Sequence, residues 1–599
     1  MCGIIGYVGD QESLPIVADG LKNLEYRGYD SAGVALTDAE GMRIYKSKGE
    51  IDHLTLPDED PATIGIGHTR WSTHGKPTDA NAHPHTDCSG EIAVVHNGII
   101  DNFDELKDGL DGHTFTSETD TEVVAHLLEE EYDGTDLPAA VNEVVTQLTG
   151  SFALGVTATG FDGIVAVRQD SPLVVGYGDD GQFIASDVPA FVEHTQEVTY
   201  LENGDVAVLT RDDVTIYRNG DVVEGEHQQV DWEPERAGKA GYEHYMLKEI
   251  HEQPTALRQT ISGRIDLTDG QVDLDVELPT EYLQSLEEIQ IVAAGTSYHA
   301  GLYARQLLEE YAEVRVSVEV ASEYEFRGGR DPWRTLVIAV TQSGETADTL
   351  DAMRTAANAG AKTLAITNTV GSTAAREADD VVYIRAGPEI GVAATKTFAA
   401  QVATLAMFTV YLGRERGVLD GTRATALLKS VRSLPGAIQQ VLDVDESVAE
   451  IAEEYVDGSA FFFIGRAMGA PVSLEGALKL KEISYCHAEG FAAGELKHGT
   501  LALVTEKTPV IAIMTAGGKP EETLHNVKEV QSRGAPVIGV SSIDSAEKYL
   551  DASLAVPETG ILEPLVGNVY LQLFAYYVAD LRGRNIDKPR NLAKSVTVK

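Results

Sequence analysis

The spacing of apolar residues divides the chain into two parts with different predicted architecture. Up to about residue 215, short apolar runs such as IIGYVG, IAVVHNG and SFALGVTA are separated by Gly, Asn and Asp, which is typical of strands joined by turns. Helical patterns interrupt them at residues 14–24 and 121–131. We therefore predict an α+β domain in which stacked sheets carry helices on the outside.

From about residue 285 onward, strands and helices alternate. Apolar runs such as IQIVAAG and TLVIAVTQSG end in Gly and lead into amphipathic helical stretches, which indicates parallel sheets covered on both faces. The segment TQSGETADTL at residues 341–350 aligns without a gap with TAGGKPEETL at 515–524, and the next predicted strand follows at the same distance in both copies (367 − 341 = 541 − 515 = 26). We expect two copies of one doubly wound α/β unit.

Domain boundaries follow from these changes of pattern and from a polar stretch, HQQVDWEPERAGKAG, that precedes a helical segment. We expect an N-terminal domain at residues 2–216, a linker with a connecting helix at 217–284, α/β units at 285–421 and 453–590, and a tail at 591–599. The tail has no helix or strand pattern of its own, and tails of this kind are usually solvated.

The charge of the chain is strongly unbalanced, since 46 basic and 95 acidic residues give a net charge of 46 − 95 = −49. Binding to nucleic acid or to an anionic membrane surface is not expected, because both need clustered Lys and Arg. Carboxylates spread over the whole chain favour adaptation to a salty cytosol, where a Debye length of ~3 Å in molar salt screens their repulsion. An ordinary acidic protein is the alternative.

Only three cysteines occur, an odd and sparse set that argues against a disulfide framework. The N-terminus lacks the basic and apolar regions of a signal peptide, and no apolar stretch reaches ~20 clean residues. We expect a soluble, cytoplasmic protein.

His83, His85 and Cys88 could form a metal site, but no fourth ligand stands at a zinc-like spacing and a strained NAHPH turn explains them better. We therefore expect no metal and no cofactor. Cys88 and Cys486 are expected to be unpaired, largely buried thiols. The first histidines of HTRW and HNG are expected to be hydrogen-bonded structural residues and not acid–base catalysts.

The N-terminal part carries residues suited to nucleophilic chemistry. Removal of Met1 before Cys2 and a small Gly would leave a thiol and a free α-amine on one residue, and the amine, with a pKa of about 7.7–8.0, can act as base for the thiol. HTRWSTHG at residues 68–75 offers an Arg and hydroxyls that can clamp a carboxylate. HNGII at 96–100 offers an amide pair of the kind that forms an oxyanion hole, and Asp120 could bind an α-ammonium group.

CGI, EYRGYDSAG, HTRW-THG, NAHPH, HNG and SETDTE occur in this order. In this combination the N-terminal part resembles the class II (N-terminal nucleophile) glutamine amidotransferases, which implies an αββα fold. The resemblance implies that Cys2 attacks the glutamine amide while Asn97 and Gly98 hold the oxyanion. It also implies a set of glutamine-binding residues, namely Arg70, Trp71, Thr73, His74, Asp120 and, in a closing loop, Arg27.

Two strand-to-helix turns of the first α/β copy are suited to hold an anion. GTSYH at residues 295–299 and TQSGET at 341–346 combine hydroxyls, amides freed by Gly and a helix N-terminus. Either turn alone is more often a simple helix cap. The second copy has Ala, Gly and Gly at 516–518 where the first has Gln, Ser and Gly, so we expect one phosphate site per chain.

SLEGALKLKEISY and GELKHG carry further charged residues, of which Lys479 and Glu482 could be a plain surface ion pair. With PRNLAKSVTV and the duplicated unit, these motifs resemble the sugar isomerase (SIS) domains and the tail of the isomerising glutamine–fructose-6-phosphate aminotransferases. That family converts fructose 6-phosphate and glutamine to glucosamine 6-phosphate and glutamate, the first step of amino-sugar biosynthesis, and channels ammonia between two sites.

The resemblance assigns roles to the C-terminal residues and implies a homodimer. Lys594 would form a Schiff base with the open-chain ketose, Glu482 would move a proton between C1 and C2, and Lys479 would assist near the developing alkoxide. His498 would help to open the ring, and in the family this histidine is supplied by the partner subunit. The residues that would bind the sugar phosphate are Thr296, Ser297, Thr341, Gln342, Ser343 and Thr346. The chain departs from the family pattern at Ala294, Thr341 and Ala394, where Cys, Ser and Ser are usual.

Two other functions stay open at this point. The N-terminal half could serve a different acceptor, as in amidophosphoribosyltransferase-like proteins, although the duplicated SIS-like half counts against it. The C-terminal half could be a sugar-phosphate sensor that regulates a partner, although Glu482, His498 and Lys594 together disfavour a pure binding module.

Overall fold

The computed structural model describes residues 2–24, 30–70, 78–169, 171–230, 239, 242–327 and 329–597. The chain forms two compact units. The first contains the N-terminal part up to residue 237 together with the end of the chain from Ala593, and the second contains residues 238–592. In the part of the chain that the structure describes, no helix has both the length and the apolarity needed to cross a bilayer.

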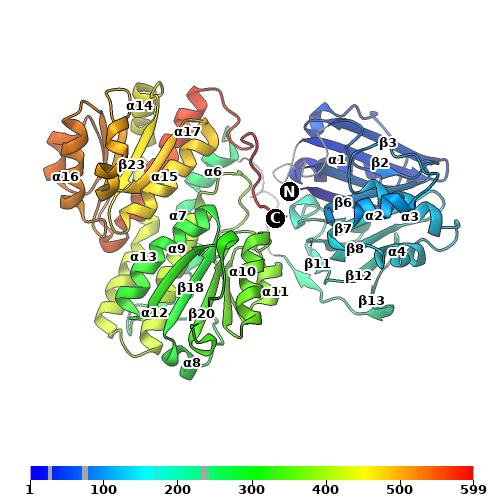
Figure 1. Cartoon of the computed structure of the whole chain (residues 1–599), viewed down its shortest axis with the longest axis horizontal. Coiled ribbons are helices and arrows are strands. Elements are labelled where there is room, and N and C mark those ends of the chain that lie inside the picture. Colours follow the sequence, from blue (N-terminus) through cyan, green and yellow to red (C-terminus); the bar gives the residue numbers. More distant parts are fainter. Residues whose placement is uncertain are drawn as a thin grey trace. The chain divides into compact units, whose positions relative to one another are not determined.

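Two antiparallel sheets form the first unit, with strand orders β15-β11-β9-β10-β1-β4-β2-β3 and β14-β13-β12-β8-β7-β6-β5 (Figure 1). The strands of the first sheet are β1 (Gly3–Gly9), β2 (Ser31–Asp38), β3 (Gly41–Lys48), β4 (Ile64–Arg70), β9 (Val174–Gly178), β10 (Gly181–Ala185), β11 (Glu197–Tyr200) and β15 (Gln228–Gln229). Those of the second are β5 (His85–Thr86), β6 (Ile92–Ile100), β7 (Gly150–Ala158), β8 (Ile164–Gln169), β12 (Asp205–Leu209), β13 (Val214–Arg218) and β14 (Asp221–Val223).

Alternating side chains of these strands build separate layers of core. Ile4 and Val8 of β1 pack against Val95 of β6 and Ala153 of β7, between the two sheets. On the far side of the second sheet, strand residues such as Val94 pack against α3 (Glu122–Glu131) and α4 (Leu137–Val145), near the short α2 (Phe103–Gly109). The amphipathic helix α1 (Ser13–Leu24) packs on β1 and β4 of the first sheet. The predicted αββα arrangement is therefore confirmed.

The first unit continues beyond residue 216. Strand β14 pairs with β13 by Ile216–Val223 and Arg218–Asp221, and β15 pairs with β11 further along the chain. These pairings hold the segment up to Gln229 in the sheets of the first unit, because they supply hydrogen-bond partners for its backbone N–H and C=O groups.

The second unit contains two five-stranded parallel sheets with the same strand order, β19-β18-β20-β21-β22 and β24-β23-β25-β26-β27. The first comprises β18 (Glu288–Ala293), β19 (Arg315–Val320), β20 (Thr335–Val340), β21 (Lys362–Thr367) and β22 (Asp380–Tyr383). The second comprises β23 (Phe461–Gly465), β24 (Ala488–Ala492), β25 (Val510–Met514), β26 (Val537–Ser541) and β27 (Ala552–Ala555). The identical orders confirm the predicted duplication.

Helices cover both faces of each sheet in the second unit (Figure 1). The helices packed around the first sheet are α9 (Gly295–Tyr311), α10 (Ala347–Asn358), α11 (Thr373–Glu377), α12 (Lys396–Glu415) and α13 (Gly421–Leu442). Those around the second are α14 (Asp445–Tyr455), α15 (Gly469–Ser484), α16 (Pro520–Gln531) and α17 (Glu563–Leu581). Three short helices, α6 (Tyr245–His251), α7 (Gln253–Ile261) and α8 (Thr280–Ser285), and the hairpin of β16 (Ile265–Asp266) and β17 (Gln271–Val272) precede the first sheet.

One hydrophobic core runs through both α/β modules. Ile291 of β18 and Phe463 of β23 belong to the same cluster of buried residues, together with the inner faces of α12 and α17. The outer faces form separate cores, with Val292 against α10 in the first module and Phe462 against α16 in the second. Because the two modules share a close-packed inner core, their relative positions are fixed. This packing places the charged residues of α15 next to the first module.

The first of the two turns predicted to hold an anion is already helical. The turn GTSYH is itself the opening of α9, which begins at Gly295. Gly295 has φ +54, a conformation that a β-carbon disfavours, and it lets the chain turn directly from strand to helix. The amides of Thr296 and Ser297 therefore lie in the first turn of the helix.

Candidate active sites

The structure brings the predicted nucleophile and its oxyanion partner together in the first unit. Cys2 directly precedes β1 and is partly buried. Asn97 lies near the end of β6, and its side-chain Nδ2 donates a hydrogen bond of 3.1 Å to the carbonyl oxygen of Cys2. Gly98 follows with φ +128, and a Cβ at this position would collide with the carbonyl oxygen of Ser151. Only glycine fits here.

A buried histidine orients the Asn97 side chain. His68 Nε2 lies 2.9 Å from the carbonyl oxygen of His96 and 3.1 Å from Asn97 Oδ1. Burial lowers the pKa of His68 to about 3, so the ring is neutral at physiological pH. A carbonyl oxygen can only accept, and the single ring hydrogen therefore sits on Nε2 and holds Asn97 with its NH₂ group toward Cys2.

Arg70 and Asp120 lie near the same site. Arg70 ends β4 and is buried, and burial lowers its pKa against the opposing effect of the charges of Cys2 and Asp120. Asp120 is buried too, and its Oδ2 accepts the backbone N–H of Ile100 at 2.9 Å. Of the residues expected to contact glutamine, these two are described. The other four, Arg27, Trp71, Thr73 and His74, lie outside the described residues.

The second unit contains the two turns predicted to hold an anion, and they end adjacent strands. Thr296 and Ser297 follow β18, and residues 341–346 follow β20, which pairs with β18. After β18 the chain continues to β19 at one edge of the sheet, whereas after β20 it continues to β21 toward the opposite edge. The two turns therefore flank the point where the strand order reverses. Ligands of open α/β sheets bind at such points.

Hydroxyl groups line these turns. Thr341 Oγ1 accepts the N–H of Gly344 at 3.2 Å and lies 3.4 Å from Thr346 Oγ1, and Ser343 Oγ accepts the N–H of Glu345 at 3.2 Å. Ser297 Oγ accepts a bond of 3.0 Å from Gln401 on α12. Ser343, Gln342 and Thr346 remain partly exposed. The turns can therefore offer hydroxyls and helix N-termini to a phosphate group.

In the second module a side chain of the protein fills the equivalent turn. Glu563, at the first position of α17, is buried, and its Oε2 accepts the N–H of Ala516 at 2.7 Å and the hydroxyl of Ser542 at 2.6 Å. The carboxylate thus takes the position of an anion at this turn. This contact supports a single phosphate site per chain.

A cluster of buried charges adjoins the open turn. Lys479 on α15 is fully buried, with Nζ 2.6 Å from Glu482 Oε2 and 3.4 Å from Glu475 Oε1. Nζ also donates to Thr296 Oγ1 at 3.1 Å, which links α15 of the second module to α9 of the first. Burial alone would lower the pKa of Lys479, but Glu475 and Glu482 outweigh it and hold this pKa above its ordinary value. Lys479 is therefore a cation and not an amine nucleophile.

Glu475 and His299 belong to this cluster although the sequence did not single them out. Glu475 is completely buried and accepts bonds from Thr296 Oγ1 at 3.0 Å and from His299 Nδ1 at 2.7 Å. Burial raises the pKa of Glu475, but Lys479 and His299 outweigh it and the pKa is lowered. The only available signal was the spacing of Glu475, Lys479 and Glu482, which places all three on one face of a helix.

Two further predicted residues, His498 and Lys594, belong to other segments of the chain. His498 ends the 3₁₀ helix at Ala493–His498 and is exposed. Lys594 is partly buried and groups with the first unit, as part of the segment from Ala593. Just before it, the N–H of Arg590 donates to Tyr485 Oη at 2.8 Å and its guanidinium lies over the Tyr485 ring. The start of the tail is thus attached to the end of α15.

His83, His85 and Cys88, which the sequence suggested as possible metal ligands, do not form one cluster among the described residues. His83 and His85 are buried among the histidines behind Asn97, and His85 Nε2 lies 3.0 Å from Thr119 Oγ1. Cys88 is exposed, contrary to the expectation of a buried thiol, whereas Cys486 is buried as expected. Cys88 lies instead beside His113 and His126.

Comparisons with known proteins agree with this division of the chain. A glutamine amidotransferase domain model matches residues 68–193, and an SIS domain model matches residues 282–411 and 456–581. The chain is 60% identical to the glutamine–fructose-6-phosphate aminotransferase [isomerizing] of Halobacterium salinarum, and 48% and 47% identical to the proteins of the same name from Methanosarcina mazei and Thermus thermophilus, each over 100% of both chains. The structure of the C-terminal domain of glucosamine-fructose-6-phosphate aminotransferase from Francisella tularensis is 36% identical with a TM-score of 0.55, covering 59% of this chain and 99% of that one.

The buried charge cluster generates a testable prediction. Replacing Glu475 by Gln keeps the shape of the side chain but removes one of the two charges that compensate Lys479. Breaking a buried ion pair in this way costs about 3–5 kcal/mol, so the second unit should unfold at a clearly lower temperature in calorimetry. Glu489→Gln, at an exposed position of β24, is the matched control. Equal melting temperatures for the two variants would contradict the role given to Glu475.

Proposed function

The chain belongs to the family of isomerising glutamine–fructose-6-phosphate aminotransferases, and from this membership we propose that it makes glucosamine 6-phosphate and glutamate from fructose 6-phosphate and glutamine. The first unit hydrolyses glutamine, and the ammonia passes to the sugar site of the second. The main support for the proposal is the position of the charged Lys479 side chain, which contacts Thr296 beside the hydroxyl-lined turns of the first module.

In the first unit, Cys2 acts as nucleophile and its own α-amine as base. The thiolate attacks the amide carbon of glutamine, ammonia leaves after taking up a proton, and water then cleaves the thioester to release glutamate. Asn97 Nδ2 and the Gly98 amide stabilise the oxyanion, which their positions beside Cys2 support. Arg70 pairs with the substrate carboxylate and Asp120 with its ammonium group, and Arg27, Trp71, Thr73 and His74 complete the glutamine site.

In the second unit, the sugar phosphate binds Ser297, Thr341, Gln342, Ser343 and Thr346, with Thr296 linking this site to Lys479. Lys594 condenses with the C2 ketone of the open-chain sugar and releases water, and ammonia then displaces the lysine. Glu482 carries the proton from C1 to C2, and Lys479 stabilises negative charge on the neighbouring oxygen. Because the pKa of Lys479 is held above its ordinary value, it is not the amine that forms the Schiff base, and this supports Lys594 in that role.

Further features of the protein follow from the same proposal. His498 opens the sugar ring in the site of a second copy, which its exposure in a single chain supports, so the working form is a homodimer. We assign residues 2–216 to the amidotransferase, 217–284 to the connection, 285–421 and 453–590 to the SIS domains and 591–599 to the catalytic tail. The first residues of the connection, up to Gln229, still pair with the sheets of the first unit. None of the three cysteines, all of which the structure describes, forms a disulfide, and this suits a reducing, cytoplasmic location.

The nucleophile is tested by Cys2→Ala. This variant should lose glutamine hydrolysis and glutamine-dependent synthesis, because the chain then has no thiol paired with its own amine. Conversion of fructose 6-phosphate to glucose 6-phosphate should survive, since that chemistry belongs to the other unit. Cys486→Ser, at a buried position of the second unit, is the control and should retain glutamine hydrolysis. Glutamate release by Cys2→Ala would refute the assignment.

The Schiff base is tested by Lys594→Arg. Arginine keeps the charge but cannot form the imine, so synthesis should stop while glutamine hydrolysis continues. Borohydride reduction of the native protein with fructose 6-phosphate should add the mass of the sugar to the peptide containing Lys594.

Lys588→Arg, just before the tail, is the matched control. Burial lowers the pKa of Lys588 to about 8, which makes it the strongest competing amine. Synthesis should persist in this variant. Trapping of the sugar on Lys588, or an active Lys594→Arg variant, would return Lys594 to the role of an ordinary tail residue.

We also propose that the protein is adapted to high salt, because its net charge of −49 must be screened for the compact state to be stable. The melting temperature should rise steeply between dilute buffer and molar KCl. A melting temperature that stays level across this range would show that the acidic surface is unrelated to salt.

A further inference from the structure

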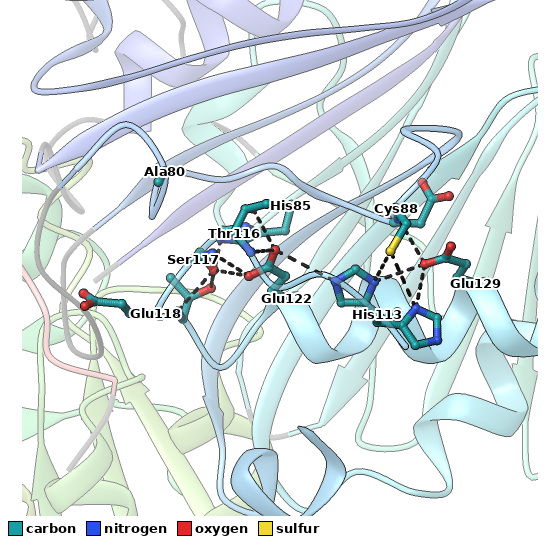
Figure 2. A network of polar contacts seen from close by, with 12 residues as sticks. Ala80, His85, Cys88, His113, Thr116, Ser117, Glu118, Glu122 and Glu129 are labelled. Carbon is teal, nitrogen blue, oxygen red and sulfur yellow. Dashed lines mark hydrogen bonds and ion pairs between the residues drawn. The ribbon is translucent and has the colours of Figure 1, made fainter. Parts of the chain in front are cut away.

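A cluster of side chains that could bind a metal lies at helix α3 of the first unit. Cys88, His113, His126 and Glu129 each direct one donor atom to a common point, and the four atoms lie within 4.8 Å of one another. Figure 2 shows Cys88, His113 and Glu129 at one end of a network of polar contacts that continues to Glu122, Thr116 and Ser117. Three separate segments supply them: the turn after β5, the loop before α3, and α3 itself, where His126 and Glu129 are one turn apart.

We propose that these four side chains bind one Zn²⁺ ion in a closed, tetrahedral structural site. A thiolate, two imidazoles and a carboxylate are donors that Zn²⁺ accepts, and four protein ligands leave no position for a substrate. The proposed reaction does not use this ion.

The distances within the cluster fit a tetrahedral zinc site. Cys88 Sγ lies 3.8 Å from His113 Nδ1 and 3.7 Å from His126 Nδ1, and Glu129 Oε2 lies 3.0 Å and 3.1 Å from the same two nitrogens. Bond lengths of ~2.3 Å to sulfur and ~2.0–2.1 Å to nitrogen and oxygen give tetrahedral edges of ~3.6 Å and ~3.3 Å. Small adjustments of the side chains therefore suffice to place an ion between them.

Hydrogen bonding alone accounts for the cluster less well. If both Nδ1 atoms carry hydrogens, then these two groups, the backbone N–H of Cys88 and the Cys88 thiol all donate to the single carboxylate of Glu129. If instead one Nδ1 accepts from the thiol, that ring loses its bond to Glu129. A cation at the centre satisfies the sulfur, both nitrogens and the carboxylate at once.

The surroundings of the cluster resemble the outer shell of a metal site. Metal-bound histidines usually have their second ring nitrogen near a carboxylate or carbonyl. His113 Nε2 lies 3.3 Å from Glu130 Oε1, and His126 Nε2 lies 3.9 Å from Glu122 Oε1. Glu129 also accepts the backbone N–H of Cys88 at 3.0 Å. His126 is buried and Cys88 exposed, so an ion can reach ligands that the fold already holds.

An ion at this position would brace the loop that leads to Asp120. His126 faces Glu122, whose two oxygens accept the N–H groups of Thr116 and Ser117 at 2.7 Å each. These two residues and His113 belong to the segment that precedes Asp120. Tying His113 to α3 therefore shortens the free length of this segment and stabilises the first unit against unfolding.

The proposal is tested on the untagged full-length protein, purified in molar KCl and stripped with a chelator. Adding Co²⁺ in place of Zn²⁺ should give one bound ion per chain, with a thiolate-to-cobalt charge-transfer band and the intense d–d bands of tetrahedral Co²⁺. Zinc should displace the cobalt and raise the melting temperature of the first unit.

Cys88→Ser should lose the charge-transfer band, while Cys486→Ser, the matched thiol control, should keep it. Glu130→Gln should keep the band but weaken zinc binding about 10-fold, since it changes only the residue behind His113. Failure to retain stoichiometric metal after dialysis, or a charge-transfer band that persists in Cys88→Ser, would overturn the proposal and leave a metal-free hydrogen-bonded cluster. Neither result bears on glutamine hydrolysis, so this test is separate from that of the proposed function.

Discussion

The buried ammonium group of Lys479 is the constraint on which the second unit depends. A charge without solvent is costly unless it is paired, and Lys479 is paired with Glu475 and Glu482 on its own helix. Its bond to Thr296 extends this compensation to the first module, and the shared core keeps the two modules in the register that the bond requires. The arrangement places a positive charge next to the turns that we propose to hold the sugar phosphate, in a chain whose net charge is strongly negative.

The two α/β modules contain similar turns, and these turns differ in what contacts their backbone amides. In the first module the turn after β20 keeps its hydroxyls partly exposed. In the second module, the carboxylate of Glu563 accepts a hydrogen bond from the backbone N–H of Ala516 at the corresponding turn. A carboxylate satisfies the same backbone groups as a phosphate oxygen, so the second turn is stable without a ligand. The duplicated fold thus leaves one turn open and fills the other with a side chain of its own.

The first unit uses desolvation for a different purpose. Burial lowers the pKa of His68 and also that of His96, so both rings stay neutral. A neutral imidazole has one donor and one acceptor, and this asymmetry orients the Asn97 amide toward Cys2. The contacts of His68 fit the expectation of a hydrogen-bonded structural residue that positions Asn97.

The sequence by itself determined the α+β and doubly wound α/β classes and the duplication, because these depend on local periodicity. The αββα arrangement and the proposed site residues Cys2, Asn97, Lys479 and Glu482 came from contiguous motifs and the family resemblance that they carry. Only the tertiary structure decided which distant residues meet. Glu475 and His299 are 176 residues apart, and Cys88 meets His113 and His126 across 25 and 38 residues. Such contacts depend on how helices pack on sheets, and no local pattern in the chain encodes that packing.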